Sequence, residues 1–380
     1  MELELTSDQE LFVDTARRFL TDTCPPAELR NLRHSPEGFD RAYWRQGAEL
    51  GWTSLLVADD DGGGSVSGAG VRDLALVANE LGRHAAPGPL LPTNVVAAAL
   101  SRFGTGEQKA QELRGLLTGD LVATWCLTGP RPLDDVGDVR LAATETGAGF
   151  RLTGRKSLVE AGAQADVLLV VARDDDRLTQ VLVPADAPGV TIAPLHSLDL
   201  TRRFAEITFS EVEVPATAVV GEPGEGQGDV DALLRLAIVI QLAEMVGAMG
   251  RALDITIEWA FDRYTFGRPL ASYQELKHRF ADMKMWLEAS HAIADAAAAA
   301  VQENAPDAAE LVSAGKAYVG RYGPELVQDC VQMHGGIGLT FDHDLHLYLR
   351  RVVIGSMLYG TVAEHHDRLT VILEEREDAA

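Results

Sequence analysis

Arg-Tyr-Thr-Phe-Gly occupies residues 263–267, and Gln-Met-His-Gly-Gly-Ile-Gly follows at residues 332–338. These two stretches decide the fold of the chain. Both interrupt sequence of strong helical character, because residues 233–260 are mostly apolar and residues 274–303 carry large apolar side chains followed by an alanine-rich stretch. Long helices of this kind bury their apolar surface against one another, so the pattern from residue 230 onward predicts an antiparallel helix bundle.

The bundle is completed by helices expected at residues 309–333 and 342–358, and by a last helix that ends near residue 375. Only the acidic final residues are expected to form a disordered tail.

Ahead of the bundle, the sequence up to about residue 118 is mainly helical. Ser7-Asp8-Gln9-Glu10 predicts a capping box, in which Glu10 reaches back to the cap amide. Pro25-Pro26 ends that first helix, and the helical pattern returns over residues 71–81.

The character changes near Asp120, where short β-branched runs alternate with Pro, Gly and Asp. This pattern is typical of a small β-barrel or sandwich and not of βαβ units. A Gly/Glu-rich linker at residues 221–228 closes the block. The expected strands are 167–171, 180–184, 189–192 and 204–215.

These patterns together predict an α+β protein. A chain of 380 residues is long enough for two or three domains. We expect an N-terminal helical domain over residues 1–118, a middle β domain over 119–229 and a C-terminal helical bundle over 230–380. The net charge of −24 argues against nucleic-acid binding. Any anionic ligand must therefore be held by a locally basic pocket.

The cysteines and the N-terminus indicate a cytoplasmic protein. Cys24, Cys126 and Cys330 are isolated, which fits a reducing compartment and argues against a disulfide framework or a thiolate metal site. We therefore expect no metal. Met1-Glu2-Leu3-Glu4 lacks the basic-then-apolar layout of a signal peptide. No uninterrupted apolar run reaches eighteen residues, so no membrane span is expected.

The order of helical domain, small β domain and bundle, together with the two motifs, resembles the acyl-CoA dehydrogenase family. Gln274 lies seven residues after Gly267 and precedes Ala281-Asp282-Met283, as in that family. Gly335-Gly336-x-Gly338 and Gly360-Thr361 lie at the family's distance from the C-terminus. The resemblance covers essentially the whole chain. It implies FAD as cofactor, an acyl-CoA substrate, a homo- or heterotetramer, and a place in fatty acid or steroid degradation.

The resemblance also assigns the cofactor contacts. Arg263 suits a pyrophosphate, Phe266 offers an apolar surface, and glycines 335 and 336 let backbone amides approach an anion closely. Simpler interpretations stay open. Arg263 could form a surface ion pair with Asp262 or Asp282, Phe266 could pack in the core, and the glycines could serve a turn. The implied cofactor-binding set is Arg263, Thr265, Phe266, Gln274, Gln332, Gly335, Gly336, Thr128 and Thr361.

The middle block departs from the family where the isoalloxazine ring would lie. Of the family's flavin loop only Thr128 is recognisable in residues 128–134. The following Trp-Ile-Thr/Ser element reads Leu158-Val159-Glu160. A glutamate beside the flavin N5 would disfavour the anionic hydroquinone that hydride transfer produces. Beyond Gly360-Thr361 the family's glutamine is Ala363.

The chain also lacks a carboxylate at the positions where the resemblance places the catalytic base. The family uses a carboxylate to remove the substrate α-proton while the flavin accepts a β-hydride, and one site for that base is Tyr359 here. A phenol with a reference pKa of roughly 10 is a poor base at neutral pH. The other site falls at Ala237, or at Leu234 if the helix is aligned differently. The catalytic residue is therefore unknown from sequence.

A relocated base is one alternative. Glu244 lies seven residues after Ala237, on the same helix face and roughly 10 Å further along the axis. A buried glutamate paired with a basic residue would look the same in sequence. Glu364 and His365 are weaker candidates on the last helix.

The losses follow a pattern. In the family, the Arg-Thr-Phe-Gly and Gln-x-x-Gly-Gly segments reach across to a neighbouring subunit's flavin. This chain keeps those segments and lacks the elements of its own active site. We hypothesise a non-catalytic subunit that completes the FAD site of a paralogous acyl-CoA dehydrogenase subunit. Residues 343–348 resemble such subunits from actinobacterial steroid side-chain degradation. The alternatives are a self-sufficient homotetramer that uses Glu244, a flavin-free scaffold, and a flavin oxidase or monooxygenase on the same fold.

Overall fold

The computed structural model describes residues 5–129 and 138–378. The chain divides into two compact units, each discontinuous in sequence. The sheet unit comprises Arg30–Leu74 and Pro87–Ala237, and the bundle unit comprises Met1–Leu29, Ala75–Ala86 and Ile238–Ala380. The three-domain boundaries expected from the sequence stay a prediction.

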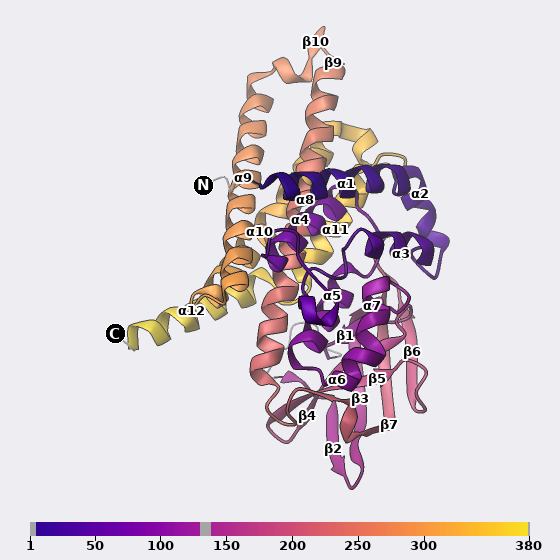
Figure 1. Ribbon diagram of the computed structural model, residues 1–380. Coiled ribbons are helices and arrows are strands. Elements are labelled where there is room, and N and C mark those ends of the chain that lie inside the picture. The colour runs from indigo at the N-terminus through magenta and orange to yellow at the C-terminus, as the bar shows by residue number, and fades with distance from the viewer. Residues whose placement is uncertain (1–4, 130–137, 379–380) are drawn as a thin grey trace. The chain divides into compact units, whose positions relative to one another are not determined.

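The sheet unit is built on one mixed eight-stranded sheet, in the order β6-β7-β3-β2-β4-β5-β8 with β1 paired to β4 (Figure 1). Most pairs are antiparallel, but β1 runs parallel to β4. The predicted small β domain is confirmed. Three of the four expected strands lie within observed ones, and the fourth, 189–192, begins one residue before β6. The strands are β1 Ala123–Cys126, β2 Ala142–Thr146, β3 Gly149–Glu160, β4 Val167–Asp174, β5 Arg177–Pro184, β6 Val190–Leu195, β7 Phe204–Pro215 and β8 Val219–Val220.

Apolar side chains fill the interior of this sheet. Leu152, Val170, Val183 and Ile207, from four different strands, are fully buried. Because successive strand residues point to opposite faces, the alternation along β7 places Ile207 and Phe209 inside and the intervening Thr208 less deeply.

Short and medium helices make up the N-terminal part, as the sequence predicts. The capping box of the first helix lies one residue earlier than predicted. Thr6 and Gln9 form it, in place of Ser7 and Glu10. The helix ends at Thr23, before the two prolines. The helices are α1 Ser7–Thr23, α2 Pro26–Asn31, α3 Arg41–Glu49, α4 Gly70–Arg83, α5 Leu90–Phe103, α6 Gly106–Gln108 and α7 Arg114–Thr118.

The C-terminal part consists of long helices, and the short β9–β10 hairpin joins α8 to α9 at one end of them (Figure 1). The predicted helices are all present. The first of them begins at Gln227, so the end of the Gly/Glu-rich stretch is helical and not linker. The last extends to Asp378, further than expected. The elements are α8 Gln227–Asp262, β9 Tyr264–Thr265, β10 Arg268–Pro269, α9 Gln274–Glu303, α10 Ala308–His334, α11 Leu345–Met357 and α12 Val362–Asp378.

Within the bundle unit, α4 and α8 cross in close contact. A Cβ atom built on Gly82 would lie 1.9 Å from the Glu244 carbonyl oxygen, and one built on Gly247 would lie 2.0 Å from the Asn79 carbonyl oxygen. Glycine is therefore required on both helices. The close contact of the two backbones fixes the position of α8 along α4.

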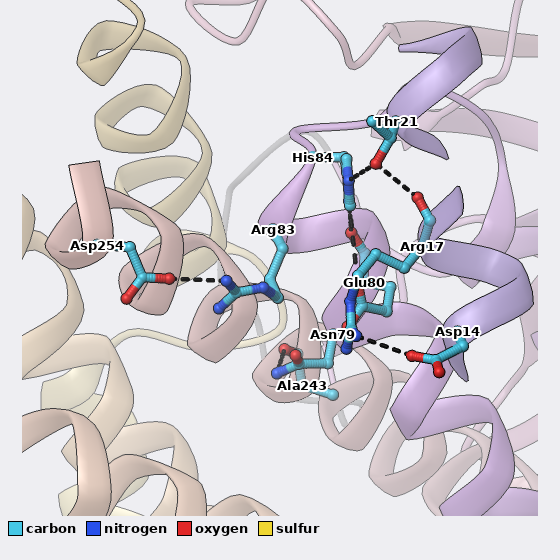
Figure 2. Close-up of polar contacts among 9 residues, drawn as sticks. All are labelled: Asp14, Arg17, Thr21, Asn79, Glu80, Arg83, His84, Ala243 and Asp254. Atoms are coloured by element: carbon cyan, nitrogen blue, oxygen red, sulfur yellow. Dashed lines mark hydrogen bonds and ion pairs between the residues drawn. The ribbon is translucent and has the colours of Figure 1, made fainter. Parts of the chain in front are cut away.

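Polar contacts around α4 hold the neighbouring helices in place (Figure 2). The buried carboxylate of Glu80 accepts from Arg17 of α1, at 2.9 Å between Nη2 and Oε1. Arg83 reaches α8, where its Nη2 lies 2.7 Å from Asp254 Oδ2. The His84 ring lies between the Glu80 carbonyl oxygen and Thr21. Together they anchor α1 and α8 to α4.

The three cysteines, Cys24, Cys126 and Cys330, are all buried, and none of them forms a disulfide bond. Burial raises the pKa of the Cys126 thiol to about 12, and burial likewise raises the pKa of Cys330 to about 12.

One helix, Gln227–Asp262, is long and apolar enough to cross a membrane by length and composition, but 89% of its most apolar window is buried inside the protein. In the described part of the chain, no group of three or more His, Cys, Asp or Glu residues is placed to hold a metal ion.

Candidate functional site

The first motif forms a tight hairpin at the end of α8. Tyr264–Thr265 pairs with Arg268–Pro269, and the two residues between them, Phe266 and Gly267, have φ angles of 52° and 80°. Two successive positive φ angles are typical of the type I′ turn, which matches the twist of a hairpin. The Tyr273 hydroxyl donates to the Thr265 carbonyl oxygen at 2.7 Å, which holds one strand against the start of α9.

The hairpin presents an aromatic tip to solvent. Phe266 is 96% exposed, and Tyr264 and Phe261 are 63% and 64% exposed. Core packing, the simpler interpretation of Phe266, is therefore wrong for this chain. A phenylalanine in the left-handed region and open to solvent is unfavourable on both counts.

Arg263 precedes the hairpin and is exposed. Among the residues that the structure describes it forms no ion pair with Asp262 or Asp282, and the latter lies nearer to Arg279. The guanidinium of Arg263 instead lies over the Trp259 ring, with its Cζ 5.9 Å from the ring centroid. Its five donors are open to an incoming anion.

The second motif forms the C-terminal end of α10 and is exposed to solvent. The helix ends at His334, and Gly335 follows with a φ of 65°. No atom lies within 4 Å of a Cβ built on Gly335 or Gly336, so the backbone there is accessible on the side that a side chain would fill. Gln332 and Ile337 are also exposed.

A stack of rings brings the two motifs together. The Trp259 ring, one turn before Arg263, lies on the His334 ring with centroids 5.1 Å apart and planes 18° apart. His343 meets His334 edge-on, with centroids 4.4 Å apart. Arg263 and the Gly335-Gly336 turn, 72 residues apart in sequence, therefore lie at the same end of the bundle.

Gln274 is the first residue of α9 and is exposed. The structure assigns it no hydrogen bond among the described residues, so its amide is available to a ligand. Thr265 is half-buried in β9.

Tyr359, at the first expected position of the base, keeps an unusual backbone. Its φ is 61°, and Gly360 follows at 110°. The Tyr359 carbonyl oxygen lies 3.0 Å from Nε2 of buried His365. Thr361 caps α12, since its backbone N–H and its hydroxyl both donate to Glu364 Oε2, at 2.7 and 2.9 Å. Glu364 and Thr361 thus serve the helix start.

The second expected position lies on a face of α8 that is packed and internally paired. Ala237 is fully buried. One turn later Gln241 accepts from Lys316 of α10, which also donates to the Gly355 carbonyl oxygen. Glu244 follows, 7% exposed, with its Oε1 2.5 Å from Nη1 of Arg351. A carboxylate so enclosed and held leaves no approach for a substrate carbon, which argues against Glu244 as a relocated base.

In the sheet unit, Thr128 and Glu160 are both engaged with the protein. The Thr128 hydroxyl donates to the Ser157 carbonyl oxygen at 2.5 Å. Glu160 is 6% exposed, and its Oε1 lies 3.4 Å from Nε of Arg202, which is 5% exposed. The glutamate is therefore matched by a buried cation and is not an isolated charge. Residues 130–134 of the expected flavin loop lie outside the described residues.

Sequence reasoning did not find Trp259, His334 or Arg202. Trp259 stands four residues before Arg263, so the helical repeat places both on one face and could have suggested their contact. His334 lies inside the second motif but carried no assigned role. Arg202 offers no local signal, because its pairing with Glu160 depends on the register of β3 against β7.

Comparison with known proteins assigns the family. The sequence matches the profiles "Acyl-CoA dehydrogenase, N-terminal domain" over residues 6–120, "middle domain" over 124–212 and "C-terminal domain" over 232–369. It is 30% identical to acyl-CoA dehydrogenase FadE27 of Mycobacterium tuberculosis, over 91% of this chain and 90% of that protein. The chain belongs to the acyl-CoA dehydrogenase family.

Other relatives have a similar sequence identity to this chain. Acyl-CoA dehydrogenase IpdE2 of Mycobacterium tuberculosis is 29% identical over 95% of this chain and 96% of that protein. A chain from the crystal structure of the ChsE4–ChsE5 complex of Mycobacterium tuberculosis is 28% identical, with a TM-score of 0.88 over 99% of both chains. The family comprises flavin-dependent oxidoreductases that act on CH–CH bonds of acyl-CoA substrates, and its cofactor is FAD.

The two ends of FAD fit this chain unequally. At the bundle end, exposed Arg263 and the open backbone of Gly335 and Gly336 suit a pyrophosphate. In the sheet unit, the positions expected beside the isoalloxazine hold a Thr128 hydroxyl already donating within the protein and a buried Glu160–Arg202 pair. The residues present suit the nucleotide half of the cofactor better than the ring half.

Proposed function

We propose that this chain is the non-catalytic subunit of a heteromeric acyl-CoA dehydrogenase, and that it completes the FAD site of a paralogous subunit that carries the catalytic carboxylate. The observation that carries the proposal is the exposed hairpin tip beside an exposed Arg263 and an open Gly335-Gly336 turn. An aromatic tip and an anion-binding edge presented together suit a dinucleotide held in a neighbouring chain.

The positions of the missing base support the same role. Tyr359 and Ala237 carry no carboxylate, and the nearest alternative, Glu244, is enclosed with Arg351. FAD would supply hydride acceptance when bound. The contribution of this chain is to bind and orient its nucleotide half through Arg263, Gln332, Gly335 and Gly336, with Thr265, Phe266 and Gln274 around them. The ChsE4–ChsE5 relative was solved as a complex of two named components, which is compatible with a paired assembly.

The chain purified alone is expected to be colourless, because it offers only the nucleotide half of a flavin site. Its visible spectrum and its flavin content per chain test this directly. Co-expression with a paralogous subunit should restore about one flavin per pair. A yellow protein with one flavin per chain, bleached without oxygen by an acyl-CoA, would contradict the proposal and restore a self-sufficient enzyme, with Glu244→Gln as the next variant.

Arg263→Ala is expected to lower the flavin content of the assembled complex. Loss of a charge-assisted contact to a phosphate weakens binding by about 1.5–3 kcal/mol, or roughly ten- to a hundredfold in affinity. Flavin absorbance per assembled pair after dialysis measures the effect. Arg321→Ala is the control, because Arg321 is an exposed arginine on α10 of the same unit that pairs with Glu325. Equal flavin retention in the two variants would remove Arg263 from the site.

A further inference from the structure

The ring stack at the end of the bundle has a role that the cofactor contacts alone do not assign. Trp259 lies at the end of α8, His334 at the end of α10, and His343 just before α11. The stack therefore joins three elements at the point where both nucleotide-binding segments begin. Nothing else among the described contacts links Arg263 to the Gly335-Gly336 turn so directly.

The hydrogen bonding of His334 defines its required state. His334 is 5% exposed, and its Nδ1 lies 2.8 Å from the Cys330 carbonyl oxygen, so Nδ1 carries the proton and donates. Its Nε2 is buried and has no hydrogen-bond partner among the described residues. Protonation would place an N–H at Nε2 with no acceptor, which is costly in a buried position.

We propose that Trp259, His334 and His343 form a positioning stack that holds Arg263 and the Gly335-Gly336 turn together, and that the stack requires a neutral His334. The inference rests on the proposed function, in which these two segments bind the nucleotide half of FAD. His334 is a positioning residue here, because it acts through the ring of Trp259 and through the turn that follows it.

The charged surroundings of His334 agree with the neutral form. Burial lowers the pKa of His334 below its usual value, and the neighbouring His343 lowers it further, while the Cys330 carbonyl acts in the opposite direction. From α8, the positive charge of Arg263 lies beyond the Trp259 ring. On α10, Asp329 is held by Arg279 of α9. Among the residues that the structure describes, no carboxylate raises the pKa of His334.

The sign of the pH dependence follows. Below the usual histidine pKa of about 6.5, the His334 ring binds a proton when it is unfolded or unstacked but not when it is stacked. Stacking is therefore complete at neutral pH and is lost as the pH falls through the lowered pKa of His334. Nucleotide affinity should fall with it, by up to about tenfold per pH unit, since each unit corresponds to about 1.4 kcal/mol.

Two measurements on the full-length chain test the stack. The first is tryptophan fluorescence between about pH 7.5 and pH 5, because unstacking from His334 changes the surroundings of the Trp259 indole. A change with a midpoint below about 6.5 is expected in the native protein. It should vanish in His334→Phe, which keeps an aromatic ring without a titrating nitrogen, and in Trp259→Phe, which identifies the responding indole. It should persist in His366→Phe, the control at an exposed histidine of α12.

The second measurement is the affinity for ADP, by isothermal titration calorimetry over the same pH range. Wild type should lose affinity on acidification, His334→Phe should keep its neutral-pH affinity without that loss, and His334→Ala should bind weakly throughout. A fluorescence step that survives in His334→Phe, or an ADP affinity that rises on acidification in wild type only, would overturn the stack. An intact step with no ADP binding at any pH would instead overturn the nucleotide site and with it the proposed function.

Discussion

Arg351→Met is expected to lower the free energy of unfolding of the bundle unit by about 3–5 kcal/mol, the cost of leaving a buried charge without its partner. Arg351 is 1% exposed, and besides Glu244 it reaches the Ala86 carbonyl oxygen, at 2.9 Å from Nη2. Removing the guanidinium leaves the buried Glu244 carboxylate without its cation and the Ala86 carbonyl oxygen without its hydrogen-bond donor. Urea unfolding followed by circular dichroism measures the loss.

The control for that variant is an exposed pair of the same type. Arg151 Nε lies 2.6 Å from Glu213 Oε1, but the two side chains are 46% and 57% exposed, so Arg151→Met should cost far less than Arg351→Met. The double variant Glu244→Met/Arg351→Met should recover most of the loss, because well-packed apolar residues can replace a buried ion pair at little cost. If Arg351→Met behaved like Arg151→Met, the buried pair would not be what closes this face of α8.

Lys156→Met is expected to raise stability at neutral pH. Lys156 is fully buried in β3, and its Nζ donates to the Leu127 carbonyl oxygen at 2.7 Å. Burial lowers the pKa of Lys156 to about 7, whereas in the unfolded chain it lies near 10.5. Between those values the unfolded chain binds a proton that the folded chain does not, so wild-type stability rises with pH, by up to about 1.4 kcal/mol per unit.

Methionine removes this penalty, at a cost of about 1 kcal/mol for the carbonyl that loses its donor. The gain of Lys156→Met over wild type should thus be largest near pH 7 and shrink toward pH 9, as measured by unfolding midpoints at several pH values. The range stops at pH 9 because the raised pKa of Cys126 adds an opposite trend above it. Lys284→Met is the control, since Lys284 is 61% exposed on α9. A pH-independent difference would show that the lysine keeps its proton when buried.

Much of the fold could be predicted from local sequence patterns. The β-branched runs and the 3.6-residue repeats of the long helices lie in the sequence itself, and α9 begins and ends at the residues predicted, Gln274 and Glu303. Boundaries set by competing local hydrogen bonds were less certain. Thr6 and Ser7 can both cap a helix, and the Gln9 side chain decided in favour of Thr6.

The site was predictable to the extent that it consists of short contiguous motifs. The hairpin turn at Phe266-Gly267 and the helix end at Gly335 follow from residues next to each other in sequence. The Arg351–Glu244 and Arg202–Glu160 pairs do not, because each joins residues from separate elements whose register is fixed only by the packed fold. Sequence offered a buried pair as one interpretation of Glu244, but it could not name the arginine.

The burial of all three cysteines has a practical consequence for following assembly. Toward a thiol-directed dye the folded chain behaves much like a cysteine-free protein, since Cys24, Cys126 and Cys330 are shielded and two of them keep their protons far above neutral pH. A single cysteine introduced at position 266, on the exposed tip of the hairpin, would then be a unique attachment point for a fluorophore. Its emission would report when another chain comes to cover that tip.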